Sequence, residues 1–193
     1  MAPDLKMTVL TALYEQGMKW VAENKKDRNV FIFISSSIGG LRDSDRKEFL
    51  EQLKPCLKKG DMFLVGVDMR KDPELIDKAY SKEVAGPFIL NNLGRINREL
   101  EGTFNLDNFF LHRYYNPIHG ENTTMVISKC DQTVSIKGEE VKLKAHEVIM
   151  INRSKKWLPE ELHKEVATLG VELVKCFTDK KEFFLEALYQ KND

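Results

Sequence analysis

The sequence lacks the features that mark membrane, secreted and nucleic-acid-binding proteins. No apolar run approaches the roughly eighteen residues of a transmembrane helix. The N-terminus, with Asp4 and Lys6 and no apolar core, does not resemble a secretory signal. Charge of one sign is not in excess, because 30 basic residues balance 30 acidic residues. We therefore expect no binding to nucleic acid or to an anionic membrane surface.

Cysteine and histidine are both scarce, which argues against disulfide and metal frameworks. The three cysteines are odd in number and widely spaced, so we expect reduced thiols in a cytoplasmic setting. Cys56 is expected to pack on a helix face, and His163 to be inert on a surface helix. No pair of histidines has the i, i+4 spacing of a zinc site, so no metal is expected. The four histidines are His112, His119, His146 and His163.

The chain does contain two apolar strands with a helical pattern between them, at residues 30–34 and 62–67. Each strand ends in small or acidic residues. This arrangement predicts a parallel α/β sheet whose strand ends open into a ligand-binding crevice. No glycine-rich nucleotide loop precedes the first strand. At 193 residues the chain is long enough for one ordinary core, or for one core with a small appended lobe.

Helices are predicted where apolar residues recur at helical spacing and capping residues begin the run. Asp45 with Glu48 has the spacing of a capping box, Pro55 ends that helix, and Asp72 caps a helix that begins at Pro73. Gly170 ends the last helix. The predicted helices are 7–22, 45–55, one from 73, 88–100 and 159–170. Alternating strands are predicted between 109 and 151, and two more at 171–177 and 183–189.

The loop Ser35–Gly40 is the first candidate for chemistry. Small residues after a buried strand let a ligand approach the backbone, and the glycines permit a positive φ. A plain strand-to-helix turn explains the same residues. Asp68 ends the second strand and is open to a structural or a functional interpretation, whereas Arg70 and Lys71 are most simply solvated charges.

Several aromatic residues are candidates for lining a small-molecule pocket, although each also fits a place in the core. They are Tyr80, Phe88, Tyr114, Tyr115 and Trp157. From the chemistry of its residues alone, the chain is an α/β ligand-binding protein with a β-rich lobe.

A series of ordered motifs along nearly the whole chain resembles one known family. The motifs are Leu13–Trp20, Ile34–Gly40, Gly60–Pro73, Asn97–Leu100, Tyr115–Pro117, Asp131–Val134 and Ser154–Trp157. They are similar to the C-terminal part of the histidine-specific, S-adenosylmethionine (SAM)-dependent methyltransferases. That family includes the histidine Nα-methyltransferases of ergothioneine synthesis and the fungal dimethylallyltryptophan N-methyltransferases.

The resemblance implies a partial class I, Rossmann-like methyltransferase sheet with an inserted α+β substrate lobe. Residues 1–86 would form the C-terminal half of the core, 87–150 the lobe and 151–193 a closing αββ unit. It also implies SAM as cofactor and the amino group of an amino acid or a related small amine as substrate. Aligning the amine with the methyl group is then the main catalytic task.

Site residues follow from the resemblance position by position. Ser35, Ser36 and Gly39 would contact the cofactor, in a loop between cofactor and substrate. Tyr80 matches a tyrosine that holds the substrate carboxylate through its hydroxyl. Ser154 matches a hydroxyl that contacts the substrate side chain. Two further positions, Phe88 and Met125, would wall the side-chain pocket.

Three positions depart from the family pattern. Gly40 replaces an asparagine that helps to bind the substrate carboxylate, and Ser35 replaces a glycine. Asn152 stands where a glutamate bonds the imidazole in the histidine-specific enzymes. Losing a charge-assisted hydrogen bond in a buried site costs about 1.5–3 kcal/mol. Histidine itself is therefore not the expected substrate.

The family's glycine-rich cofactor loop and ribose-binding acid lie upstream of the motif that begins here at Leu13. We therefore expect this polypeptide alone to bind SAM weakly and to methylate nothing. The alternative is a non-catalytic binding subunit. Its exposed sheet edge would pair with a second copy, as a homo-oligomer, or with a complete homologue. A third, weaker alternative is a pocket that serves a different reaction.

Overall fold

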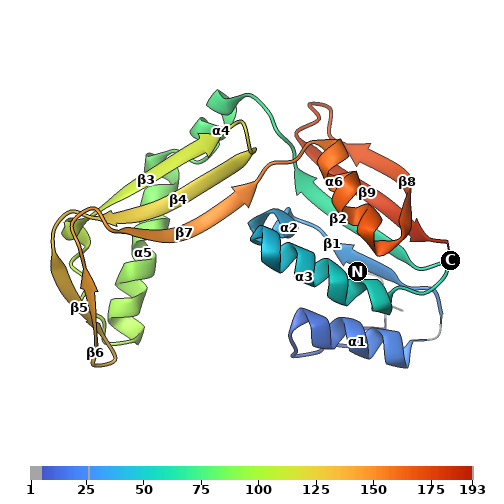
Figure 1. Cartoon of the computed structure of the whole chain (residues 1–193), viewed down its shortest axis with the longest axis horizontal. Coiled ribbons are helices and arrows are strands. Elements are labelled where there is room, and N and C mark those ends of the chain that lie inside the picture. Colours follow the sequence, from blue (N-terminus) through green and yellow to red (C-terminus); the bar gives the residue numbers. More distant parts are fainter. Residues whose placement is uncertain (1–5, 26, 193) are drawn as a thin grey trace. The chain divides into compact units, whose positions relative to one another are not determined.

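The computed structural model of the chain describes residues 6–25 and 27–192, with the backbone alone for residues 82–85. Contacts divide the chain into two compact units. The first unit is Met1–Val67 with Leu158–Asp193, and the second unit is Asp68–Trp157. Figure 1 labels their helices and strands. The second unit extends beyond the predicted lobe, 87–150, at both ends.

The first unit is built on a four-stranded mixed sheet with the order β1-β2-β9-β8. β1 and β2 run parallel, with Val30 opposite Met62. β8 and β9 form an antiparallel pair. The strands are β1 (Val30–Phe33), β2 (Met62–Asp68), β8 (Val171–Thr178) and β9 (Phe184–Lys191). The α/β class is confirmed, but the sheet is mixed and not wholly parallel, because the two late strands form a hairpin.

Helices α1, α3 and α6 lie on the same side of this sheet (Figure 1). Their bounds are α1 (Tyr14–Asn24), α3 (Asp43–Leu53) and α6 (Pro159–Val166), and two 3₁₀ turns, η1 (Lys54–Cys56) and η3 (Ala167–Leu169), extend α3 and α6. Phe33 of β1 stacks on Phe49 of α3 with ring centroids 4.8 Å apart. Strand alternation turns Val30 and Ile32 away from these helices, and they are 53% and 60% exposed. One face of β1 is therefore covered and the other is open.

Arg46 joins α3 to α6 inside the first unit. Its Nε lies 2.6 Å from Glu165 and its Nη2 lies 2.6 Å from Asp43, with the side chain almost fully buried. Burial opposes the charged form of Arg46, but hydrogen bonds and charge from Glu165 and Asp43 outweigh it and raise its pKa. His163 of α6 has a partner in the core, since its Nδ1 lies 2.6 Å from the hydroxyl of the buried Tyr189.

The second unit packs two helices on antiparallel strands. The three-stranded sheet has the order β3-β4-β7, and β5 and β6 form a separate hairpin. Its elements are α4 (Pro73–Ala79), α5 (Lys82–Glu99), η2 (Leu106–Asn108), β3 (Phe109–Asn116), β4 (Glu121–Ser128), β5 (Gln132–Ile136), β6 (Glu139–Leu143) and β7 (Val148–Lys155). Leu93 of α5 and Val126 of β4 belong to one apolar cluster that forms the core of this unit.

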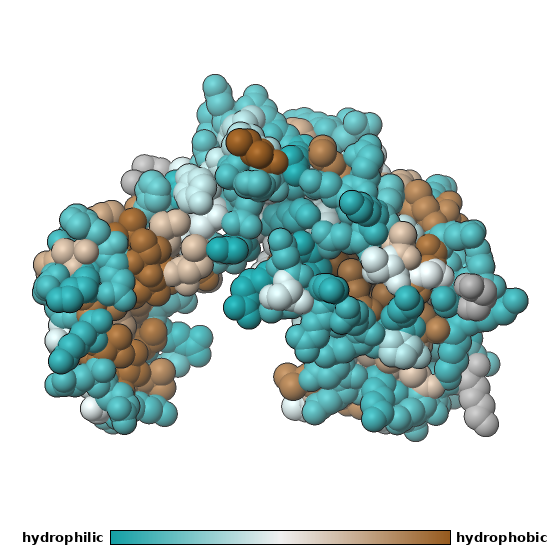
Figure 2. Space-filling model, in the orientation of Figure 1, coloured by the Kyte–Doolittle hydropathy of each residue, from teal (hydrophilic) through white to brown (hydrophobic). Residues whose placement is uncertain are grey.

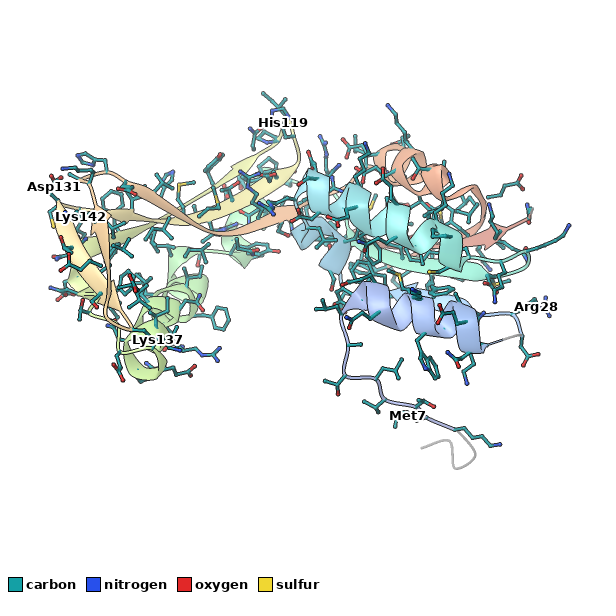
Figure 3. All side chains as sticks on the ribbon, turned by 60° about the horizontal axis from the view of Figure 1, so that its bottom comes forward. Met7, Arg28, His119, Asp131, Lys137 and Lys142 are labelled. Atoms are coloured by element: carbon teal, nitrogen blue, oxygen red, sulfur yellow. The ribbon has the colours of Figure 1, made fainter. Side chains whose placement is uncertain are left out.

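Figure 3 shows how the second unit is drawn out along its strands. His119 marks the turn between β3 and β4, and Asp131 and Lys142 lie toward the other end of the unit. Lys137 sits at the β5–β6 turn, where its N–H donates to the carbonyl of Leu100 at the end of α5 (2.9 Å). The chain turns at His119–Gly120 between β3 and β4 and at Lys137–Gly138 between β5 and β6.

Local capping rules predict some boundaries and miss others. Asp72 caps α4 as predicted, accepting from the N–H of Glu74 at 2.8 Å. Asp45 does not cap α3, because the helix already begins at Asp43 and the Asp45 carboxylate pairs with Arg42 at 2.8 Å. The helix predicted at 7–22 begins only at Tyr14, and the one predicted at 88–100 begins earlier, at Lys82. Pro55 and Gly170 end their helices as predicted.

Cys56 is buried, as predicted, and burial raises the pKa of its thiol. No helix within the described residues is long and apolar enough to cross a membrane. Nor do the residues that the structure describes hold three or more potential metal ligands in one group. Apolar and hydrophilic residues both come to the surface of each unit (Figure 2).

Candidate functional site

A buried lysine lies at the centre of the polar residues of the second unit. Lys156 is 1% exposed and directly follows β7. Its Nζ lies 2.6 Å from Oδ2 of Asp68, 2.7 Å from the Tyr80 hydroxyl and 2.9 Å from Oγ of Ser154. We call Asp68, Lys71, Tyr80, Ser154 and Lys156 the Lys156 cluster.

The fold brings these residues together from three elements. Asp68 is the last residue of β2, and Tyr80 is the C-cap of α4. Ser154 and Lys156 are two residues apart along an extended segment, so alternation turns both side chains to the same side. The backbone of Lys156 is also fixed, because its N–H donates to the Gly120 carbonyl at 2.6 Å.

Asp68 is shared between two lysines. Lys71 Nζ lies 2.5 Å from Oδ1 of Asp68, while Lys156 holds the other oxygen. Lys71 is therefore not a solvated charge, as its sequence context suggested, but a largely buried partner. Arg70 is also held, since its Nη1 lies 3.2 Å from the Pro117 carbonyl oxygen and 3.3 Å from that of Ile118. The Arg70 contacts join residues 47 and 48 positions apart, so no short segment reveals them, whereas Asp68 lies only three residues before Lys71.

Arg113 of β3 covers the ring of Tyr80. Its guanidinium carbon lies 4.5 Å from the ring centroid, and its terminal nitrogens donate to the Tyr80 carbonyl and to Oδ1 of Asn122. Burial lowers the pKa of Arg113, against the opposing charge of Asp77. Nε of Arg113 and Nδ2 of the buried Asn122 have no hydrogen-bond partner among the described residues. Unused donors therefore remain beside Tyr80.

A polar pocket of about 330 Å³ opens on this side of Tyr80. Its lining residues are Asp77, Tyr80, Ser81, Arg113, Tyr114 and Tyr115. Of the aromatic residues singled out from the sequence, the structure gathers the three tyrosines here. Phe88 is 75% exposed on α5, and Trp157 is fully buried and belongs to the core.

Three of the predicted substrate residues, Met125, Asn152 and Ser154, lie on the β3-β4-β7 sheet. Ser154 lies opposite Asn122, and Asn152 lies opposite Thr124. Because side chains alternate, Met125 points to the other face from Asn122 and Thr124. Tyr80 and Ser154 meet through Lys156, whereas Met125 and the exposed Phe88 do not join the Lys156 cluster.

The Ser35–Gly40 loop lies in the first unit. Ser35 and Ser36 adopt positive φ values of 66° and 58°, whereas Gly39 and Gly40 are helical, in α2 (Ser37–Gly40). The positive φ that the glycines would permit is thus adopted by the two serines instead. Ser36 is fixed by its N–H, which donates to the Gly66 carbonyl at 3.1 Å. A Cβ placed on Gly40 would meet nothing within 4 Å, so packing does not require glycine there.

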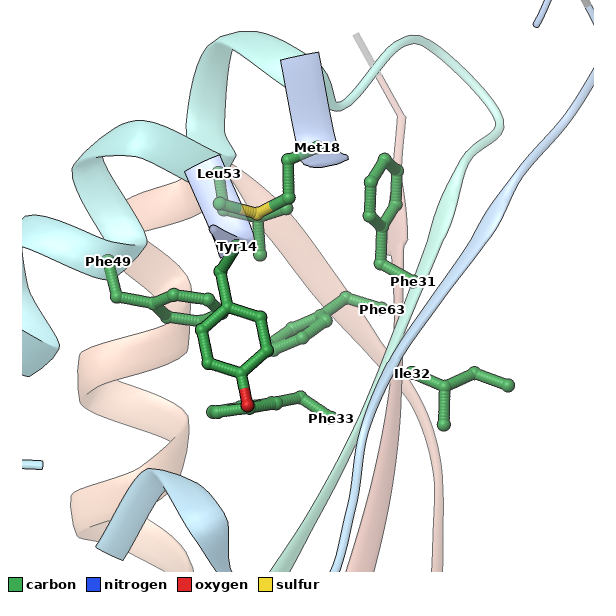
Figure 4. Close-up of a pocket in the computed structure, with 8 residues that line it drawn as sticks. All are labelled: Tyr14, Met18, Phe31, Ile32, Phe33, Phe49, Leu53 and Phe63. Carbon is green, nitrogen blue, oxygen red and sulfur yellow. The ribbon is translucent and has the colours of Figure 1, made fainter. Parts of the chain in front are cut away.

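A second pocket, of about 100 Å³, lies between α1, α3 and β1 in the first unit (Figure 4). The side chains that line it are apolar apart from the hydroxyl of Tyr14, which points away from Met18 in this view. Their edge-to-face and stacked rings hold α1 on the sheet. This pocket offers little to orient a polar ligand.

Sequence reasoning missed Lys156 and the role of Asp68. Ser154 was identified and Lys156 lies in the same motif, Ser154–Trp157. A lysine two residues from a predicted contact, on the same side of a strand, was the available signal. Its burial was not predictable, because it depends on Asp68 and Tyr80.

Comparison with known proteins identifies the family. Residues 1–191 match the family described as "Histidine-specific methyltransferase, SAM-dependent". The match covers nearly the whole chain, so the chain belongs to this family, and the resemblance drawn from its motifs is confirmed.

Relatives with described activities occur in bacteria and fungi. The chain is 30% identical over 157 residues to histidine N-alpha-methyltransferase of Mycobacterium tuberculosis, covering 79% of this chain and 49% of that protein. It is 25% identical over 178 residues to L-tryptophan methyltransferase of Psilocybe serbica, covering 87% of this chain and 50% of that protein. The chain thus spans about half the length of these relatives.

Among solved structures, a SAM-dependent methyltransferase from Clostridium acetobutylicum gives a TM-score of 0.43 at 11% identity, covering 90% of this chain and 63% of that one. The CcbJ methyltransferase from Streptomyces caelestis gives 0.43 at 13% identity, covering 84% of this chain and 60% of that one. Likeness at this level does not bear on the site.

Proposed function

We propose that this protein takes part in methyl transfer from SAM to the amino group of an amino acid or a related small amine. The second unit supplies the amino-acid side of the site. The observation that carries the proposal is the Lys156 cluster, in which one buried ammonium holds both Tyr80 and Ser154. The family match supports the reaction class.

The chemistry asks little of acid or base groups. When bound, SAM would supply a methyl group on a positively charged sulfur. The residues of this site would hold the amino acid so that its amine nitrogen faces that methyl group. Rate enhancement comes chiefly from holding the amine in line with the methyl group. A hydroxyl such as that of Tyr80 does this by binding the carboxylate of the same amino acid.

The loop at Ser35–Gly40 fits a ligand that lies against the backbone. Apart from the buried Ile38 its side chains are small, and the space beside Gly40 is open. We assign Ser35, Ser36 and Gly39 to the cofactor side on this basis. Within the second unit we assign Tyr80, Ser154 and Asn152 to the amino-acid side, while Gly40, Phe88 and Met125 stay predictions that rest on the family resemblance. Since Asn152 carries no charge, an amino acid other than histidine is the proposed substrate.

A methyl-transfer assay tests this proposal. The protein is incubated with trideuteromethyl-labelled SAM and a panel of amino acids and small amines, and products are identified by mass spectrometry. A labelled N-methyl product that is lost in Tyr80→Phe and kept in Tyr14→Phe is the expected result. Tyr14 is the control because it is an exposed tyrosine of the first unit that belongs neither to the polar pocket nor to the Lys156 cluster. Such a product would overturn the sequence-based expectation that this polypeptide alone methylates nothing, and absence of product from every amine contradicts the proposal.

A second candidate function is that of a partner subunit, favoured by the open edge and face of β1. Within the described residues, β1 pairs only with β2, and Val30, Ile32 and Ile34 are exposed. An unpaired apolar edge strand is a template for pairing with another chain. Light scattering on wild type and Ile32→Lys tests this candidate. Val174→Lys on the opposite edge strand, β8, is the control. A dilute monomer in all three contradicts it.

A further inference from the structure

We infer that Lys156 is a positioning residue that turns the Tyr80 and Ser154 hydroxyls into hydrogen-bond donors toward the ligand. The site then selects an amino acid whose carboxylate and side chain both accept hydrogen bonds. This inference rests on the proposed function and names the substrate class of the same site.

The ammonium group of Lys156 has as many N–H donors as it has oxygen partners. An ammonium group has three N–H donors and no acceptor. Nζ of Lys156 has three oxygen partners within 2.9 Å, one each from Asp68, Tyr80 and Ser154. Each N–H is therefore spent on one oxygen.

Lys156 is buried together with its three contacts. With the residue 1% exposed, water cannot replace a lost partner. A buried charge without its hydrogen bonds is strongly disfavoured, so the three contacts persist together. Asp68 supplies the opposite charge, and it is fixed in turn by Lys71.

The contacts with Lys156 decide where the hydroxyl protons of Tyr80 and Ser154 point. A hydroxyl that accepts from an ammonium must point its own proton elsewhere. Among the described residues, neither the Tyr80 hydroxyl nor Oγ of Ser154 has an acceptor for that proton. Both hydroxyls are thus left as donors, and a ligand is the partner that completes them.

The ligand chemistry follows from this polarity. A carboxylate accepts hydrogen bonds at both oxygens and strengthens them by its charge, so it suits Tyr80 better than a neutral carboxamide does. At Ser154, a side chain with a nitrogen or oxygen acceptor completes the hydroxyl, whereas an ammonium or a hydrocarbon does not. The amino acids that fit best therefore carry an acceptor in the side chain.

A double-mutant cycle tests the role of Lys156. Affinities for L-asparagine, L-glutamine and L-leucine, and for the carboxamide derivative of each at the α-carboxyl group, are measured by calorimetry with S-adenosylhomocysteine present. The variants are Lys156→Met, Tyr80→Phe and the double variant. Methionine matches the length of the lysine chain and removes its N–H donors. Lys142→Met, an exposed lysine on β6, is the control.

The wild type is expected to prefer each acid over its amide by about tenfold, and the two acceptor side chains over leucine. Lys156→Met is expected to lose most of the preference for an acid over its amide. In the double variant, Lys156→Met is expected to weaken binding by less than about twofold beyond the loss that Tyr80→Phe causes alone. Fully additive losses would overturn the inference, because Lys156 would then not act through Tyr80. An unchanged acid preference in Lys156→Met would do the same.

Neutron diffraction of the wild-type protein decides the hydroxyl directions without any ligand. Three deuterons on Nζ, with the Tyr80 and Ser154 deuterons pointing away from it, are expected. A hydroxyl deuteron directed at Nζ would overturn the inference. If no amino acid binds the wild type, the proposed function fails, while this map still decides the inference.

Discussion

Asp68, at the end of β2, and Lys156, directly after β7, form an ion pair of 2.6 Å in which the lysine is almost completely buried. The pair connects a strand end to the hydroxyls of Tyr80 and Ser154. The Lys156 side chain therefore contacts both the carboxylate of Asp68 and the two hydroxyls that are proposed to bind a ligand.

Removing the charge of Asp68 should destabilise the protein strongly. Asp68→Asn keeps the shape but leaves Lys156 without its counter-charge, and breaking a buried pair costs about 3–5 kcal/mol. The free energy of unfolding in urea measures this. Glu99→Gln is the control, because Glu99 and Arg95 form an exposed pair whose loss costs at most about 0.5 kcal/mol. Equal losses in the two variants would refute the importance of burial.

Glycine at position 35 should stabilise the protein. Ser35 has a φ of 66°, a conformation that costs an L-residue about 1–2 kcal/mol and glycine little. Allowing for the extra freedom of glycine in the unfolded chain, Ser35→Gly should gain about 0.5–1 kcal/mol. Ser44→Gly, in the first turn of α3, should lose a similar amount and is the matched control. A loss of stability in Ser35→Gly would contradict the observed backbone.

Gly120 should tolerate alanine worse than Gly138. Both have a positive φ, +65° and +84°, so both variants carry backbone strain of about 1 kcal/mol. A Cβ at Gly120 also meets the Lys156 carbonyl oxygen at 2.5 Å, whereas one at Gly138 meets nothing within 4 Å. Gly120→Ala should therefore lose at least about 1 kcal/mol more, measured as the difference in unfolding free energy. Equal losses would show that the β3–β4 turn can move away from Lys156.

The buried hydroxyl of Tyr189 should make the free energy of unfolding fall in alkaline solution. Burial raises the pKa of its hydroxyl above the ordinary value, and charge on Cys176 raises it further. The unfolded chain loses this proton near pH 10 while the folded chain keeps it. Stability is therefore full below about pH 10 and falls by up to about 1.4 kcal/mol per pH unit as pH rises toward the folded pKa. Tyr189→Phe should flatten the alkaline limb of unfolding free energy against pH. An identical slope in wild type and variant would contradict this.

The features that the sequence predicts well are local ones. The Asp72 cap, the stop at Pro55 and the left-handed Gly170 each depend on residues within one turn, so their chemistry is visible in a short segment. The apolar strands of the first unit were equally clear. Membership of the methyltransferase family followed from motifs of this kind.

The features that the sequence predicts poorly depend on contacts with residues far along the chain or on an unusual backbone conformation. The burial of Lys156 depends on its contacts with Asp68 and Tyr80, which lie on other elements. The residues near Lys156 in the chain therefore do not predict that burial. Ser35 and Ser36 take a conformation usually given to glycine, and their type alone does not reveal it. Tyr80 and Ser154 were predicted as site residues through the family resemblance, and their roles in binding stay predictions.

NMR mapping of amino-acid binding tests the central claim most directly. Isotope-labelled protein is titrated with amino acids while the backbone amides and the Lys156 ammonium are followed. We expect the largest shifts at Tyr80, Ser154 and Lys156, stronger for an acid than for its amide. Shifts confined to other parts of the chain, or none with any amino acid, would contradict an amino-acid site at the Lys156 cluster.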